Sequence, residues 1–93
     1  MSLLSETKEY LKITWEDEDN SLQGIISRGK NYLQELTGTE LDFEMEGQPK
    51  SLLLDYCRYA YNNALEYFEE NFHRELRRLI LQEAVKADAR QEE

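Results

Sequence analysis

Apolar residues recur along the first half of the chain at the three- and four-residue spacing of one helical face. A short helix is predicted over residues 3–12. A second helix is predicted to follow the acidic residues 16–19, with short polar side chains at Asp17, Asp19 and Ser21 capping its first N–H groups. Gly38 suits a left-handed carboxyl-terminal cap. The predicted core positions of this helix are Leu22, Ile25, Ile26, Gly29, Tyr32, Leu33 and Leu36.

The second half of the chain contains neither Gly nor Pro after Pro49, which favours helix throughout. Residues 39–48 are expected to form a loop before it. A broad apolar stripe then predicts a long central helix, and a bend is expected at residues 71–73 because an unbroken helix to the end would be far longer than average. The predicted core positions here are Leu53, Tyr56, Cys57, Ala60, Ala64, Phe68, Leu76 and Ile80.

These segments together predict an all-α fold, a single small bundle of about four helices with a long central helix. A chain of 93 residues has room for one domain, so we expect residues 1–93 to fold as a unit, with residues 88–93 as a disordered tail. No apolar stretch reaches the roughly 20 residues of a membrane span, and no basic segment followed by an apolar run marks a secretory signal. We therefore expect a protein of the cytosol without a membrane partner.

The charge of the chain is strongly negative and unevenly divided. The net charge of −9 opposes non-specific attraction to nucleic acid or to an anionic membrane. Residues 1–47 hold 11 acids and 4 bases, whereas residues 48–93 hold 9 acids and 7 bases. An acidic surface of one copy, formed by Glu16, Asp17, Glu18 and Asp19, could therefore meet a basic patch of another copy, formed by Arg74, Arg77 and Arg78.

The last helix carries a second face besides the one that it gives to the core. Arg74, Arg78, Leu81 and Val85 share this face by their helical spacing, and a monomer has no need of it. We expect it to contact another subunit, with Leu52 and Tyr59 adding to the contact because they lie off the main stripe. The alternative is a solvated surface on which Arg74 pairs with Glu70 and two aliphatic side chains are simply exposed.

The sequence gives little support for a catalytic or a metal-binding site. His73 is the single imidazole and has no evident nucleophile beside it, and Cys57 falls on an apolar stripe. One Cys with one His leaves no ordinary zinc set, and an EF-hand begun at Asp17 would have Leu22 at its glycine position and Arg28 at its bidentate glutamate position. We therefore expect no enzyme activity, no cofactor and no metal site.

Several segments resemble the small head-tail connector proteins of tailed bacteriophages and prophages. The amino-terminal half carries YLKI at residues 10–13, the acidic run 16–19 and LTG at residues 36–38. The second half carries LLLDYCRYAYNNA at residues 52–64 and FEENF at residues 68–72. Gly29 stands where a small residue such as Ala is common in these proteins.

The resemblance implies a helical subunit that assembles with copies of itself as a ring, between the portal and the tail-side connector proteins. It places the protein at the head-tail junction of the virion and, during assembly, in the cytoplasm of the bacterial host. DNA would pass through such a ring without specific binding. The alternative is a small cytosolic helical adaptor or regulatory module that binds a host bacterial protein.

Overall fold

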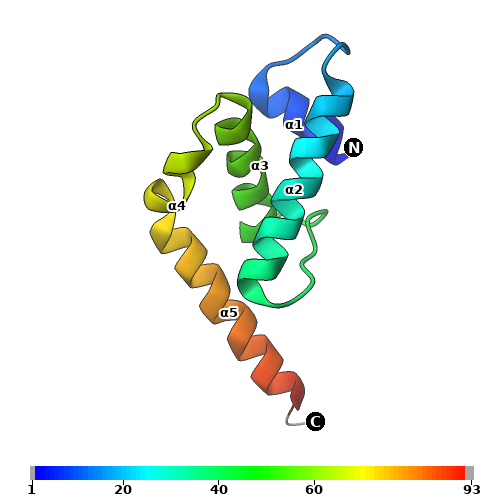
Figure 1. Ribbon diagram of the computed structural model, residues 1–93. Helices are drawn as coiled ribbons and strands as arrows, with labels where there is room; N and C mark the ends of the chain where they lie inside the picture. Colours follow the sequence, from blue (N-terminus) through cyan, green and yellow to red (C-terminus); the bar gives the residue numbers. More distant parts are fainter. Residues whose placement is uncertain (1, 92–93) are drawn as a thin grey trace.

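The computed structural model describes residues 2–91, and within this range it contains five α-helices, one short 3-10 helix and no strand. The elements are α1 (Leu3–Leu11), α2 (Asp19–Thr37), α3 (Gln48–Tyr61), the 3-10 helix η1 (Leu65–Tyr67), α4 (Phe68–Asn71) and α5 (His73–Gln91). Helix α3 lies in the middle and packs against α1, α2 and α5 (Figure 1). The predicted all-α fold is confirmed.

The ends of α1 and α2 follow from local polar residues. The Ser2 hydroxyl oxygen accepts a hydrogen bond from the Ser5 N–H at 3.1 Å and so caps α1. Gly38 ends α2 as predicted, in a left-handed conformation with φ 71°. The predicted side-chain cap at the start of α2 is absent, because Glu18 is the N-cap and makes no capping bond. Asp19 instead pairs with Lys8 of α1, at 2.7 Å.

The core lies where α2, α3 and α5 meet. The predicted core residues Leu22, Ile26, Gly29, Leu33, Leu53, Tyr56, Cys57, Phe68 and Leu76 are buried. Ile25, Tyr32, Leu36, Ala60, Ala64 and Ile80 are partly buried. Ile13, Phe43, Leu52 and Leu79 are buried as well, so the core reaches into both loops that flank α2.

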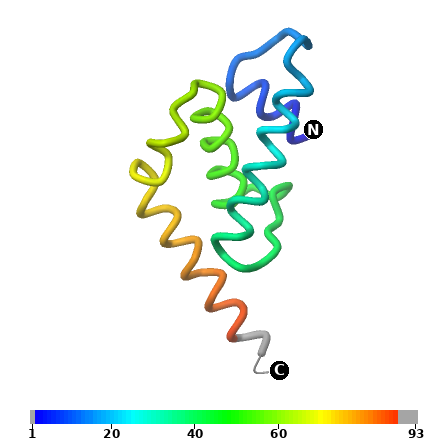
Figure 2. Tube along the Cα trace, viewed as in Figure 1, coloured from blue at the N-terminus to red at the C-terminus, as the bar shows by residue number. Residues whose placement is uncertain are grey.

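The long central helix predicted from Pro49 onward is shorter than expected. Helix α3 ends at Tyr61, and Asn63 then takes a left-handed conformation with φ 56°. Asparagine tolerates this region better than most residues, and the Asn62 side chain donates to the Arg58 carbonyl at 2.7 Å. Figure 2 shows the chain turning back at this corner. The bend expected at residues 71–73 is also present, with Phe72 standing between α4 and α5.

Aromatic rings hold this corner against the bundle. The Phe68 ring is buried among Tyr32, Tyr56, Tyr59 and Phe72, with ring centroids 5.0 to 6.1 Å apart. The Tyr32 hydroxyl donates to the Glu69 carboxylate at 2.6 Å, which ties α2 to α4. Edge-on and offset ring contacts of this kind contribute beyond the area they bury. These contacts hold together the corner from which α5 begins.

Helix α5 runs down the side of the bundle, and its last turns extend past the other helices (Figure 1). It continues through Gln91, so helix covers residues 88–91 of the segment predicted to be a disordered tail. The good helix formers in this stretch, Ala87, Ala89 and Arg90 among them, account for the continuation. Residues 92 and 93 lie outside the described residues.

Candidate subunit interface

The outer face of α5, formed by Arg74, Arg78, Leu81 and Val85, is turned away from the core. Leu81 is 57% exposed and Val85 is 68% exposed. On the opposite side of the same helix, Leu76 and Leu79 are buried in the core. Because α5 is packed on one side only, its outer face is an unoccupied stripe of two aliphatic side chains beside two arginines.

Three arginines in the first turns of α5 are available to another molecule. Arg74, Arg77 and Arg78 are exposed, and none of them forms a salt bridge within the part of the chain that the structure describes. In particular, Arg74 is not paired with Glu70. Arg77 lies at the rim of a groove between α2 and α5, whereas Arg78 lies at the rim of a groove between α3 and α5.

The acidic segment at residues 16–19 is partly occupied by contacts within the chain. The Glu18 carboxylate accepts hydrogen bonds from Trp15 Nε1 at 2.6 Å and from the Tyr61 hydroxyl at 2.9 Å. Asp19 is paired with Lys8. Glu16 and Asp17 are exposed. Half of the acidic surface predicted for subunit contact therefore holds α1, α2 and α3 together.

Leu52 and Tyr59 do not belong to an exposed contact surface. Leu52 is 2% exposed and lies in the core, because α3 is covered by helices on several sides. Tyr59 is partly buried: its ring packs edge-on against Phe68 and Phe72, and its hydroxyl accepts a hydrogen bond from Asn71 Nδ2 at 2.8 Å. The expectation that both add to a subunit contact is not supported by this packing.

Comparison with known families gives one decisive result. The model of the family described as "Phage gp6-like head-tail connector protein" matches residues 1–91. The chain belongs to this family. No curated protein and no solved structure matches the chain significantly. The resemblance found in the sequence is thereby confirmed, and the chain is a structural component of the phage head-tail connector.

Cys57 and His73, the two residues considered for chemistry, lie in different surroundings. Cys57 is completely buried, and burial raises the pKa of its thiol to about 12, so it carries no thiolate at neutral pH. His73 is exposed, and it lines the groove between α2 and α5 beside Tyr32 and Arg77. Among residues 2–91 no cluster of His, Cys, Asp and Glu is able to hold a metal ion.

No helix in the described range combines the length and the apolar character that a membrane span requires. The outer face of α5, with Leu81 and Val85 exposed, is the surface that the sequence pattern predicted for a subunit contact. Sequence periodicity alone could find that face, whereas the internal partners of Glu18 and Asp19 could not be foreseen, since they come from other elements.

Proposed function

We propose that this connector is a subunit of a homo-oligomeric ring that links the portal to the tail-side proteins and performs no catalysis. Family membership supports the connector role. The observation that carries self-assembly is the outer face of α5, where Leu81 and Val85 are exposed beside Arg74 and Arg78, which form no salt bridge among the described residues. The fully buried centre of a subunit contact is more apolar than the rest of the surface, and arginine is enriched at such contacts.

The charge of the subunit fits a ring that DNA traverses. Each copy carries a net charge of −9, so a ring of copies repels phosphate and does not hold the DNA that passes through it. The same charge opposes the approach of two copies at low ionic strength. Assembly in the cytoplasm of the host, with portal and tail-side proteins present, would overcome this repulsion through specific contacts.

The test is the size of the assemblies that the chain forms, alone and with portal, by light scattering and electron microscopy. Wild-type protein is expected to form rings, and the double variant Arg78→Glu/Leu81→Glu is expected to lose them while it remains folded. The matched control is Arg28→Glu/Asn31→Glu on the exposed side of α2, which adds the same negative charge. Rings that persist in the α5 variant would reject the contact through α5, and equal loss in the control would assign the effect to net charge.

A further inference from the structure

A second surface of the molecule is complementary in charge to the outer face of α5 and is likewise partly apolar. The loop between α2 and α3 and the neighbouring side of α5 enclose a groove of about 450 Å³. Its walls are mainly acidic and apolar: the loop contributes Glu40, Leu41, Met45 and Glu46, and α5 contributes Leu79 and Glu83, the latter paired with Lys86. Met45 is 68% exposed there and gives the groove an apolar contact surface.

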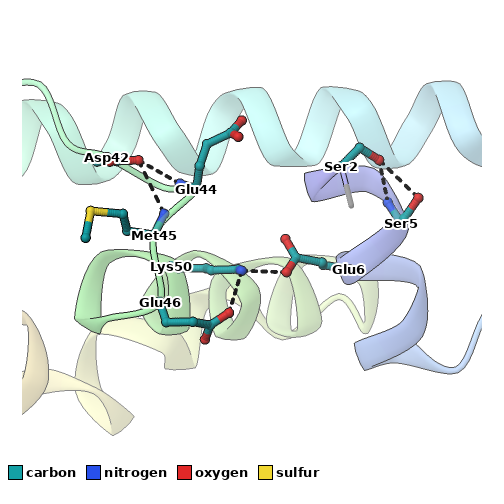
Figure 3. A network of polar contacts seen from close by, with 8 residues as sticks. All are labelled: Ser2, Ser5, Glu6, Asp42, Glu44, Met45, Glu46 and Lys50. Carbon is teal, nitrogen blue, oxygen red and sulfur yellow. Dashed lines mark hydrogen bonds and ion pairs between the residues drawn. The ribbon is translucent and has the colours of Figure 1, made fainter.

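The loop that forms this groove is held in place. Phe43 is buried in the core, and the Leu41 N–H donates to Gln34 Oε1 at 3.0 Å. Asp42 Oδ1 accepts the Glu44 N–H at 2.9 Å. Figure 3 shows the Lys50 ammonium group between Glu46 of the loop and Glu6 of α1. The groove is thus formed before any partner arrives, which lowers the cost of ordering it on binding.

Acidic groups of this groove are more open to a partner than Glu18 and Asp19 are. Glu18 and Asp19 are engaged by Trp15, Tyr61 and Lys8 within the chain. Glu40 is exposed and makes no hydrogen bond or ion pair within the described part of the chain, and Glu46 meets Lys50 but is 89% exposed. The loop therefore presents acidic side chains that are open to another copy.

We propose that this groove receives the outer face of α5 from a second copy of the chain. Leu81 and Val85 of the incoming helix pack on Leu41 and Met45, and its arginines face Glu40 and the other acids of the loop. This proposal rests on the self-assembly stated above and names the surface that accepts the neighbour. It replaces residues 16–19 as the acidic partner of the arginines.

The two surfaces lie on different sides of the same helix, which has a consequence for assembly. With 3.6 residues per turn, the outer face and the groove side of α5 are separated by roughly a third of a turn. One copy can then donate its outer face to one neighbour while its groove accepts another. Such a head-to-tail contact propagates and closes into a ring when its rotation permits.

Cross-linking between copies tests the contact directly. Val85→Cys and Met45→Cys place reactive thiols on the two exposed surfaces, while Cys57 is buried and serves as an unreactive background. A short bismaleimide added to a mixture of the two variants should give a covalent dimer containing one copy of each. Either variant alone should give little product, and a chain carrying both substitutions should give a ladder. The control pair is Val85→Cys with Ser27→Cys, an exposed position on α2.

The possible outcomes distinguish a failure of the proposed groove contact from a failure of the proposed self-assembly. If rings form but the mixture yields no more product than the Ser27→Cys control, the groove is rejected and the ring stands. Dominant self-linking of Val85→Cys would mean that outer faces pair with each other, which also rejects the groove. Absence of both rings and products would reject self-assembly itself.

The charge complementarity has its own test in the same system. Arg74→Glu/Arg78→Glu on the Val85→Cys chain should lower the yield of mixed dimer by about three- to tenfold, the size expected for two partly exposed ion pairs. Glu40→Arg on the Met45→Cys chain should recover part of that yield. Unchanged yield in the first variant, or no recovery in the second, would contradict the pairing of the arginines with the loop.

Discussion

Gly29 of α2 lies directly against the Tyr56 ring of α3. A Cβ atom at position 29 would stand 2.8 Å from Tyr56 Cδ1 and 2.7 Å from Leu53 Cδ1, closer than carbon atoms pack. Gly29→Ala would gain about 1 kcal/mol in helix propensity, but overpacking a core costs about 1 to 3 kcal/mol. We expect the variant to lose about 1 kcal/mol of unfolding free energy, measured by urea denaturation followed by circular dichroism.

Gly24 in the same helix provides the control. A Cβ there would meet only the Arg28 guanidinium, at 3.4 Å, and that side chain is flexible. Gly24→Ala should therefore raise the unfolding free energy by up to about 1 kcal/mol. If Gly29→Ala stabilises the protein as much as Gly24→Ala does, the close approach of α2 and α3 does not depend on the missing side chain.

The two leucines that the sequence assigned to a subunit contact should behave very differently when truncated. Leu52 is buried, so Leu52→Ala should lower the unfolding free energy by about 2 to 5 kcal/mol. Leu81 is exposed on α5, so Leu81→Ala should change the stability of the monomer by no more than about 0.5 kcal/mol. Urea denaturation of both variants at a concentration where the protein is monomeric checks this, and equal losses would contradict the burial of Leu52.

The fold could be predicted from sequence wherever one helix face determines burial. Leu22, Ile26 and Leu33 follow a single stripe, and they are buried as that stripe indicates. The end of α3 could not be found in this way, because the apolar pattern continues past Tyr61 while the backbone turns at Asn63. The pair of asparagines there was the available signal, since asparagine is a poor helix former that accepts a left-handed conformation.

The candidate interface was predictable in part for a related reason. The exposed face of α5 is a local property of one helix. Whether an acidic side chain is open to a partner depends instead on which residues from elsewhere in the chain contact it. Glu18 is bound by Tyr61, which lies 43 residues away in sequence. Leu52 lies off the main stripe of α3 and is nevertheless buried, because neighbouring helices cover more of α3 than one stripe indicates.

The two carboxylates that pair with Lys50 should contribute unequally to the stability of the fold. Lys50 Nζ lies 2.7 Å from Glu46 Oε1, and its side chain also pairs with Glu6. These bonds, first to Glu46 and then to Glu6, raise the pKa of the Lys50 ammonium group. The Glu6 side chain is 21% exposed and that of Glu46 is 89% exposed, so solvent screens Glu46 far more.

We therefore expect Glu6→Gln to lower the urea midpoint clearly and Glu46→Gln to change it little. The pair is well matched, since both substitutions remove one carboxylate from the same ammonium group. A larger loss of stability for Glu46→Gln would show that the ion pair between the loop and α3 stabilises the fold more than the ion pair between α1 and α3. Amide hydrogen exchange in the loop of each variant distinguishes local opening of the groove from global unfolding.

The buried thiol of Cys57 predicts a dependence of stability on alkaline pH. Burial raises its pKa from an ordinary 9.0 to about 12, so the folded chain retains a proton that the unfolded chain releases. This contribution is fully present below pH 9.0 and is lost as the pH rises toward 12. Between pH 9 and 10 the unfolding free energy should fall by about 1 kcal/mol more in wild type than in Cys57→Ala.

Tyr32 and Tyr56 also have raised pKa values, but their ordinary value of 10.0 places most of their effect above this window, and both chains share it. Urea denaturation at several pH values gives the two slopes, and equal slopes would show that the thiol is not held in a buried site.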